Sequence, residues 1–532
     1  MKIPIFYRAA LVFTALCLMH GVHAKNVTSK SHFSSRQQFQ SASPELVSGC
    51  RYSKEVAQKS SWGGHFQAVL FGGSSTKSDD IGRYFMPFGT SSASVSEELL
   101  VDASTTLHAQ NFNILTQRAI AAPSLVPMRV NPRPDAFKSV ISLHPREWSI
   151  GLGLHYHQIL FGKKSDHPLW LSISTPIVHV ERDVRLREEI TSNGGGVVSS
   201  VDVPTVLTQP LFGSMKDALH QSAWQYGKID NHAHKKTGFG DIETKLGLVL
   251  AQTESVFFDL AIGVIIPTSN KQKNHFMFEP QLGNGQHVGI MGEADLGIIL
   301  AEDDAGNWKF AYQTALNVQY LFENTQKRSF DLINKPWSRY LEMYASADQA
   351  AEFAALAGQS KNLRSTPGIN LLTQDTKVRP GVNVTWNNAL IINCCSWEFE
   401  IGYNFHAREA ESVKLKHAWV ESAAIKAANG DGMTNSKRDT TASLALNGDL
   451  VFDMPGGVLT YTPIKQTDLD FKSAAHPSVI SHTVYAAAGY RWADCKWPVG
   501  LTYGGSYEFP CQSTSNRGLT RWTLWLKADI SF

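Results

Sequence analysis

The residues that decide the fold are the last twelve of the chain, Arg521-Trp522-Thr523-Leu524-Trp525-Leu526-Lys527-Ala528-Asp529-Ile530-Ser531-Phe532. The even-numbered positions are all apolar, whereas the odd-numbered positions are mostly polar or charged. This period-two alternation predicts a β-strand with one apolar and one polar face. A strand of a soluble sheet has about 5–6 residues, whereas a tilted strand that crosses a bilayer needs about 9–11. The length therefore favours a membrane-spanning β-barrel.

The same alternation recurs along the chain, without the 3.6-residue period of a helix. It predicts strands near residues 62–72, 148–156, 169–181, 242–250, 256–266, 288–300, 308–320, 378–386, 397–405, 440–451, 457–463, 482–492, 499–509 and 521–532. Short turns are expected at 162–168, 252–255, 301–307, 387–396, 453–457 and 493–498, and long connections alternate with them. We expect an all-β fold, a transmembrane antiparallel up-and-down β-barrel of about fourteen strands with short periplasmic turns and long external loops.

The N-terminus has the features of a secretory signal peptide. A short cationic head precedes an apolar run from Ala9 to Met19, and small residues permit cleavage after Ala24. The run is too short for a membrane-spanning helix, which needs about 20 residues. Residues 25–60 are rich in Ser and Gln without an apolar period, so we expect either a mobile tail or a plug inside the lumen. Residues 61–532 would form the transmembrane barrel.

Composition narrows the class of partner. The chain has 49 Lys and Arg residues against 47 Asp and Glu residues. Nucleic-acid binding needs a basic surplus gathered on one face, so no nucleic-acid partner is expected. Five cysteines follow the signal peptide, without the spacing of a zinc finger or a CxxC redox pair: Cys50, Cys394, Cys395, Cys495 and Cys511. We expect one or two structural disulfides, and no metal or other cofactor. Cys495 and Cys511 should lie at opposite ends of one strand, too far apart to bond.

Paired titratable residues occur on the polar phase of two predicted strands. Glu398 and Glu400 could do acid/base chemistry, but no partner that would tune them is identifiable. His155 and His157 could bind a metal only with a third ligand. The common hydrolase, zinc-protease and phosphate-loop motifs are absent. We assign no catalytic residue and expect the protein not to be an enzyme, with an outer-membrane hydrolase as the weakest alternative.

The alternation also assigns side chains to the lumen. The expected lumen-facing polar residues are Asp241, Glu243, Lys245, Asp259, Glu293, Asp295, Lys309, Arg379, Glu398, Glu400 and Lys527. Charges of both signs in one lumen suit a transverse field and weak ion selectivity. Aromatic residues on the outward phase could form girdles at the two membrane interfaces: Trp148, Tyr320, Trp397, Tyr503 and Trp522.

Two stretches resemble known families. The terminal strand resembles the assembly signal of Gram-negative outer-membrane proteins, which the barrel-assembly machinery reads, and the residues that carry the likeness are Trp522, Leu524, Leu526, Ile530 and Phe532. Thr237-Gly238-Phe239-Gly240-Asp241-Ile242, followed after one hairpin by Ile265-Ile266-Pro267-Thr268, looks like the phenol meta-pathway outer-membrane proteins. Those proteins are similar to the long-chain fatty-acid channel family, which has an N-terminal hatch in the lumen. This second resemblance implies a channel for hydrophobic substrates.

The expected function is passive passage of small solutes, including hydrophobic ones, across the outer membrane. The expected partners are outer-membrane lipid, the barrel-assembly machinery and a small-molecule solute. The alternative is a non-transporting surface protein for adhesion or envelope structure, since the predicted external loops are long. The transported substrate, an open or plugged state of the pore, and the oligomeric state stay undetermined at this stage.

Overall fold

The computed structural model describes residues 29–49, 62–96, 106–108, 137–162, 167–193, 212–303, 308–349, 366–425, 463–511 and 518–532. Twelve strands form a closed antiparallel barrel: β1 (Gly64–Thr76), β5 (Arg146–Phe161), β6 (Leu169–Asp183), β9 (Ile242–Gln252), β10 (Val256–Ile266), β11 (Gly289–Glu302), β12 (Trp308–Leu321), β18 (Gly381–Cys394), β19 (Trp397–Arg408), β23 (Val479–Trp492), β24 (Val499–Pro510) and β25 (Thr520–Ser531). None of the helices in these ranges is long and apolar enough to cross a membrane.

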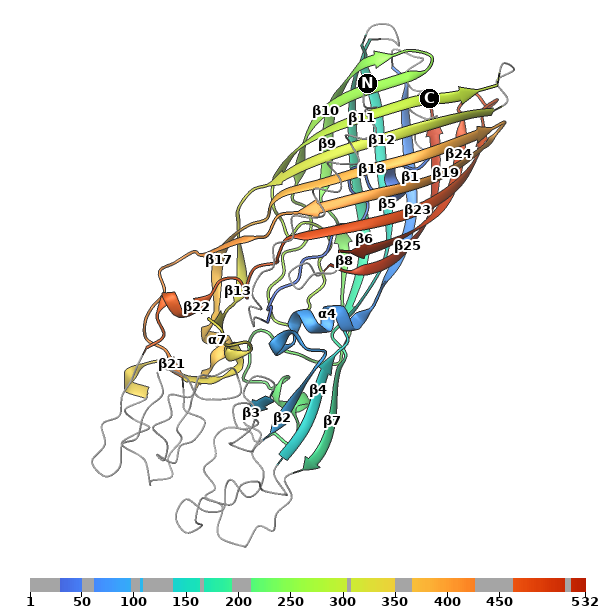
Figure 1. The fold of residues 1–532 in the computed structure, drawn as a ribbon. Coiled ribbons are helices and arrows are strands. Elements are labelled where there is room, and N and C mark those ends of the chain that lie inside the picture. Colours follow the sequence, from blue (N-terminus) through green and yellow to red (C-terminus); the bar gives the residue numbers. More distant parts are fainter. Residues whose placement is uncertain are drawn as a thin grey trace, which may run out of the picture.

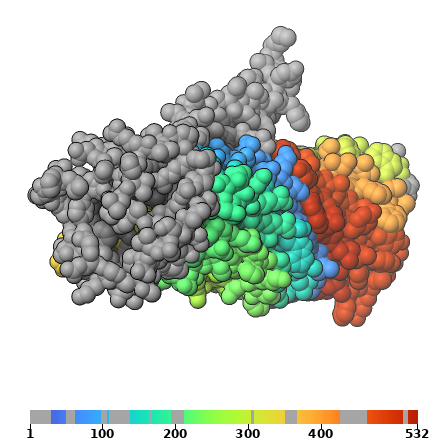
Figure 2. Space-filling model, turned by 90° about the horizontal axis from the view of Figure 1, so that it is seen from below, coloured from blue at the N-terminus to red at the C-terminus, as the bar shows by residue number. Residues whose placement is uncertain are grey.

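The barrel closes between its first and last strands. β1 pairs with β25 along its whole length, from His65 opposite Ser531 to Thr76 opposite Thr520. The amide of Gly64 donates to the carbonyl oxygen of Phe532 at 2.8 Å, which extends the ladder to the last residue. The N-terminal and C-terminal parts of the wall therefore adjoin, as the meeting of blue and red surfaces shows (Figure 2). Closure leaves no unpaired strand edge in the wall, as a bilayer requires.

Short and long connections lie at opposite ends of the barrel (Figure 1). The end with the short turns, here called the inner end, carries the connections 162–168, 253–255, 303–307, 395–396 and 493–498. The other end, here called the outer end, carries the connections 77–145, 184–241, 267–288, 322–380, 409–478 and 511–519. The expected alternation of short turns and longer loops is confirmed.

The strand count differs from the expected fourteen. β19 pairs directly with β23, from Trp397 opposite Tyr490 to Arg408 opposite Val479. The wall is therefore complete without the expected strands 440–451 and 457–463, which lie outside the described residues except for Pro463, as does the turn between them. Removal of one whole hairpin leaves the alternation of short turns and long connections unchanged.

A break in the chain separates the expected strand 378–386 into two elements. Pro380 lacks an N–H group, and Gly381 adopts a φ of +78°, so the ladder cannot run through them. Residues before the break form β17 (Thr373–Arg379), which belongs to a separate sheet with β13 (Asn324–Ser329) and β20 (Ser412–Leu415). Beyond it, β18 continues to Cys394, so the expected turn 387–396 contracts to Cys395 and Ser396.

One further strand lies beside the closed wall. β8 (His234–Phe239) pairs with the outer half of β6, whereas β9 pairs with its inner half. Between them, the amide of Gly240 donates to the carbonyl oxygen of Pro176 at 2.8 Å. Asp241 follows directly, and its carboxylate accepts the amides of Ser269 at 3.0 Å and Asn284 at 2.6 Å. The Gly-Phe-Gly-Asp stretch is therefore a strand end at which the chain turns inward.

The two faces of the wall differ in polarity as the alternation predicts. Along β25, the outward-facing Leu524 and Leu526 are 59% and 46% exposed, whereas the inward-facing Lys527 is 0% exposed. Exposed aromatic residues gather at the inner end: Trp62, Phe161, Trp308, Trp397, Trp492, Trp497 and Phe532. An apolar outer face with an aromatic belt suits contact with lipid and its interface.

The long connections fold together beyond the outer end into a compact unit, here called the outer domain (Figure 1). Its strands are β2 (Ser92–Ser96), β3 (Thr106–His108), β4 (Phe137–Leu143), β7 (Leu186–Asn193), β13, β14 (Asp331–Leu332), β15 (Glu342–Tyr344), β16 (Thr366–Pro367), β17, β20, β21 (Ala424–Ile425) and β22 (Leu469–Asp470). The helices are α4 (Ser78–Phe85), α5 (Met215–Ala218) and α7 (Gly368–Leu371), with 3-10 turns at Pro87–Gly89, Ser338–Tyr340 and Gln466–Asp468. Buried apolar side chains from all of the longer connections share one core.

Three of the described cysteines take no part in the expected disulfides, because Cys394, Cys395 and Cys495 are free thiols. The Sγ atom of Cys511 lies 2.9 Å from Nε2 of His482. Cys495 lies in an inner turn and Cys511 at the outer end of β24, so the full length of one strand separates them. The expectation that these two residues cannot bond is confirmed, whereas Cys50 lies outside the described residues.

Candidate functional site

Residues 29–49, here called the lumenal segment, run through the interior of the barrel from the outer domain to the inner end. Most of them are buried, although the segment contains only one short helix, α2 (Pro44–Val47). Ser, Gln and small residues dominate it, so it is held by hydrogen bonds and ion pairs with the inward-facing side chains of the wall. These contacts fall into four levels, described here from the outside inward.

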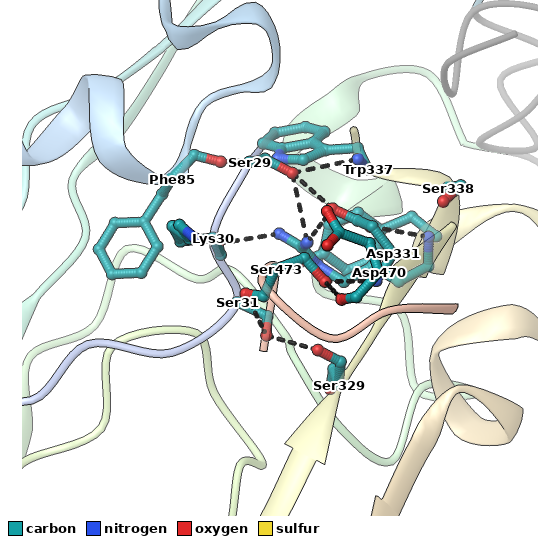
Figure 3. Close-up of polar contacts among 12 residues, drawn as sticks. Ser29, Lys30, Ser31, Phe85, Ser329, Asp331, Trp337, Ser338, Asp470 and Ser473 are labelled. Carbon is teal, nitrogen blue, oxygen red and sulfur yellow. Dashed lines mark hydrogen bonds and ion pairs between the residues drawn. The ribbon is translucent and has the colours of Figure 1, made fainter. Parts of the chain in front are cut away.

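The outermost level fixes the segment to the outer domain (Figure 3). Ser29 donates its hydroxyl to the carboxylate of Asp331 at 2.6 Å and accepts the backbone amide of Trp337 at 3.2 Å. Arg339 forms an ion pair with the same carboxylate at 2.7 Å. Ser31 pairs through its amide with the carbonyl oxygen of Ser473 at 2.9 Å. All these groups are buried, so the segment is part of the outer domain's interior.

Burial shapes the electrostatics of this level. Desolvation lowers the pKa of Lys30, although the nearby Asp470 opposes that shift. Desolvation raises the pKa of Asp470, and the neighbouring carboxylate of Asp331 adds to the effect. The ammonium group of Lys30 donates to the carbonyl oxygen of Lys472. Charges at this level are therefore held by backbone and side-chain partners together.

The second level is a belt of arginines at the outer end of the lumen. Arg182 forms an ion pair with Glu147, with its Nε 2.7 Å from the carboxylate, and donates to the hydroxyl of Ser35 at 2.7 Å. Arg521 donates to Glu508 at 2.8 Å. Two further arginines complete the belt: Arg36 of the segment itself and Arg408 at the end of β19. The three arginines of the wall donate to residues 34–36 of the segment: Arg408 to Ser34, Arg182 to Ser35 and Arg521 to the carbonyl oxygen of Arg36.

The third level combines a polar and an apolar contact. The amide of Ser41 donates to Glu243 at 2.8 Å, beside an ion pair of 2.6 Å between Lys245 and Glu293. From strand β1, Phe71 stacks on the ring of Phe39 with centroids 6.0 Å apart. That stack belongs to an inward-facing apolar cluster of Phe39, Leu46, Val69, Phe71, Val178, Val180, Leu282, Ala311, Ala389, Ile391, Tyr485, Ala487 and Trp525.

The innermost level holds the end of α2. Lys527 donates to the carbonyl oxygens of Leu46, at 2.7 Å, and Ser48. The amide of Gly49 donates to Glu400 at 3.1 Å, and Tyr485 donates its hydroxyl to the same carboxylate at 2.7 Å. Arg491 lies 3.5 Å from both Glu398 and Asp529. Positively and negatively charged wall residues therefore both form hydrogen bonds with the backbone of the segment.

Cavities beside the segment are small. One, of about 30 Å³, lies within the arginine belt and is lined by Ser34, Arg36, Arg408, Glu508 and Arg521 among others. A second, of about 20 Å³, lies between Ser34, Arg328 and Arg408. A space of this size holds about one water molecule. In this conformation, neither of these two cavities has room for an aromatic hydrocarbon or a sugar.

Most of the polar residues singled out by sequence lie inside the barrel and are at most 9% exposed: Asp241, Glu243, Lys245, Asp259, Glu293, Asp295, Glu398, Glu400 and Lys527. The expectation for Arg379 does not hold, because this residue ends β17 outside the wall and is exposed. Lys309 lies near the inner end, 45% exposed, with its ammonium 3.5 Å from Glu302. The assembly-signal residues Trp522, Leu524, Leu526 and Phe532 face outward, and Ile530 is half-buried.

The alternation put Arg521 on the polar face of its strand, but sequence reasoning missed Arg182, Arg408 and Arg491. These three stand at strand ends, where alternation cannot distinguish lumen from loop, and Arg36 lies in no strand. His155 and His157 do gain a neighbour, since the His65 ring lies 5.4 Å and 4.9 Å from theirs, centroid to centroid. Within the described ranges, however, no group of three His, Cys, Asp or Glu residues is arranged to hold a metal ion.

Comparisons with known proteins give structural likenesses only. No family model matches the chain, and no curated protein matches it. Among solved structures, it is similar to an outer membrane channel from Pseudomonas putida F1, with 10% identity over 88% of this chain and 96% of that one and a TM-score of 0.34. The transport unit of the autotransporter AIDA-I from Escherichia coli matches with 6% identity over 88% and 90% of the chains and a TM-score of 0.30. A FadL homologue from Pseudomonas aeruginosa matches with 9% identity over 88% and 89% and a TM-score of 0.25.

Proposed function

We propose that this protein is an outer-membrane channel for small hydrophobic solutes, and that the lumenal segment keeps the channel closed. The closed wall, the apolar outer face and the aromatic belt at the inner end support a barrel that spans a bilayer. A signal peptide ending at Ala24 would deliver it to the outer membrane, with the short turns in the periplasm.

The observation that carries the proposal is the apolar cluster inside the lumen. Barrel lumens are normally polar, yet Val69, Phe71 and Trp525 face inward and are at most 3% exposed. Phe39 of the lumenal segment covers this surface. Once the segment moves away, an apolar solute could occupy the place of Phe39 and bury the same side chains.

The contacts of the segment also suit reversible displacement. In the lumen, apart from the stack of Phe39, the segment is held mainly by hydrogen bonds and ion pairs, such as those of Lys527 and Glu243. Water can replace such contacts at a net cost of about 0.5–1.5 kcal/mol each. A segment held in this way can leave the lumen without unfolding the wall.

Conductance in planar bilayers tests the proposal. We expect the intact protein to be closed for most of the time, and a variant that lacks residues 25–48 to conduct steadily. In proteoliposomes, the same deletion should speed the entry of a small aromatic hydrocarbon more than that of a sugar of similar size. A deletion variant that shows the heat-modifiable gel migration of a folded barrel but neither conducts nor admits solute would contradict the proposal.

A second function is favoured by one observation, the outer domain. Loops that only shield a pore need no core of their own, yet these connections bury Phe85, Trp224, Trp337, Tyr340 and Ile369 almost completely. A rigid external unit could present a binding surface to another cell or envelope component. The silent result described above would favour this surface protein over a channel.

A further inference from the structure

We propose that the outer end of the lumen contains a binding site for one monoanion, a halide or a carboxylate group, between Arg36, Arg408 and Arg521. The site is the cavity of about 30 Å³ in the arginine belt, closed on one side by residues of the lumenal segment. The charge and the geometry of the cavity define this site, which therefore does not depend on whether the protein transports solutes.

Positive charge exceeds negative charge around this cavity. Three guanidinium groups line it, and the lining contains one carboxylate, Glu508. Glu508 is already occupied, because it accepts Arg521 at 2.8 Å and Ser481 at 2.7 Å and lies 3.7 Å from Arg36. One carboxylate therefore serves two arginines and leaves none for Arg408.

Arg408 forms no ion pair within the described residues, because the nearby carboxylate of Glu411, which favours the charged form of Arg408, is bonded to Arg328 at 3.2 Å and to the amide of His476 at 3.0 Å. The Nη atoms of Arg408 contact the hydroxyl and carbonyl oxygens of Ser34, at 3.2 Å and 3.1 Å, and the ring of His476. Within the described part of the chain, no carboxylate oxygen lies within 4 Å of it. The other neighbouring histidine, His406, bonds to Thr385 at 3.0 Å and supplies no negative charge.

Donor atoms around the cavity also lack acceptors. The Nε of Arg408 and the Nη2 of Arg36 are buried without a hydrogen-bond partner. The side chains of Arg36 and Arg521 are only 9% and 10% exposed, so bulk water does not solvate them freely. A buried cation that has no ion-pair partner, or that keeps a donor atom without an acceptor, is costly. A bound anion would supply both.

The size and shape of the cavity define the ligand. About 30 Å³ accommodates one small ion or a single carboxylate group, and not a larger polyanion. Guanidinium groups match the paired oxygens of a carboxylate, which can accept two parallel hydrogen bonds. Phe33, Val479 and Leu519 form the apolar part of the lining, which disfavours a strongly hydrated divalent anion.

Bromide is the probe for the first test, which uses the full-length protein in detergent. At constant ionic strength, replacing sulfate with bromide should stabilise the wild type relative to Arg408→Gln, as measured by the difference between their Tm shifts, because a ligand of the folded state stabilises it. Arg408→Gln should weaken bromide binding by roughly tenfold or more, since a hydrogen bond to a charged group contributes about that factor. Arg185→Gln is the matched control, because it removes the same charge from an exposed arginine paired with Asp183 at 3.0 Å.

Two more variants separate binding from folding. Arg408→Lys keeps the positive charge and loses the planar fork, so bromide should bind more weakly than to the wild type but more tightly than to Arg408→Gln. Glu508→Gln removes the competing carboxylate, so bromide should bind several-fold more tightly than to the wild type. A merely structural defect would not produce effects of opposite sign. A Tm shift that is the same in the wild type and in Arg408→Gln overturns the proposal.

Anomalous diffraction from crystals soaked in bromide locates the ion directly. We expect a peak between the three guanidinium groups in the wild type and none there in Arg408→Gln. Absence of the peak in the wild type overturns the site, irrespective of any conductance measurement. Acetate added with bromide should reduce the peak, and a peak that acetate leaves unchanged rejects the carboxylate as a ligand of this site.

Discussion

Gly153 is a wall residue that lies directly against the lumenal segment. A Cβ atom at this position would overlap the ring of Phe39, which also stacks on Phe71. Gly153→Ala should therefore displace the segment. We expect destabilisation by about 1–3 kcal/mol, the usual cost of overpacking, and a higher open probability in planar bilayers.

Gly297→Ala is the control for that substitution. Gly297 also faces the interior, but a Cβ atom added at this position would contact only the side chain of Phe257, at 3.9 Å. This variant should keep the stability and the conductance of the wild type. Equal behaviour of the two variants would show that the segment does not seal the lumen through Phe39.

His287 should make the stability of the outer loops depend on pH. Burial lowers its pKa from 6.5 to about 4. Its hydrogen bonds also require the neutral ring, because Nδ1 lies 2.7 Å from the carbonyl oxygen of Phe322 while Nε2 lies 2.8 Å from the amide of Gln326. The unfolded chain binds this proton more readily, so the stabilisation is complete above the unfolded pKa and is lost as pH falls towards the folded pKa.

Denaturant titrations in detergent measure this effect. The free energy of unfolding of the wild type should fall by about 2–3 kcal/mol more than that of His287→Gln between about pH 7 and pH 4.5. Glutamine can keep both hydrogen bonds without titrating. His232→Gln, at a side chain that is 82% exposed, is the control. Identical pH profiles for wild type and His287→Gln would rule out this role.

At the scale of the elements, β25 combines two tasks. Its outward face carries the residues that resemble an assembly signal, and its backbone closes the barrel against β1. Phe532→Ser should reduce the amount of folded barrel in the outer membrane severalfold if the terminal strand acts as the assembly signal that it resembles, since the ring, 43% exposed in the folded barrel, is not needed for the core. Refolding of the purified variant into detergent should proceed as for the wild type. A refolding defect of equal size would assign Phe532 to stability instead of recognition.

β25 was predictable because each of its residues faces either lipid or lumen, and both environments select residue type strongly. The division of residues 373–394 into two strands could not be predicted in the same way. The polar and apolar alternation continues on both sides of Pro380 and Gly381, so it does not reveal the break between β17 and β18. The path of the lumenal segment left no periodic signal at all. Its position depends on Lys527, Glu400 and Arg491, which lie hundreds of residues away in the sequence.

At the scale of the whole molecule, charge is distributed along the lumen and not only across it. Near residues 34–36 the interior carries Arg182 and Arg521 paired with Glu147 and Glu508. Near the inner end, Arg491 lies beside Glu398 and Asp529. The sequence predicted charges of both signs in the lumen. It could not predict which of them pair at each level, because that depends on the tilt of the strands and on the contacts of the segment.

The course of the lumenal segment also determines at which end of the barrel its first residue, Ser29, lies. Ser29 bonds to Asp331 in the outer domain, and Gly49 bonds to Glu400 near the inner end. The segment therefore runs along the lumen of the closed barrel from the outer end to the inner end. Since a closed barrel has no seam, the wall must form around the segment or the segment must thread through it. An epitope placed between Ala24 and Ser29 should therefore bind antibody on intact cells. The same epitope in the inner turn 493–498 should bind only after permeabilisation. Detection of the first epitope only in permeabilised cells would mean that the segment enters the lumen from the periplasmic end, and would contradict the anchoring of Ser29 in the outer domain.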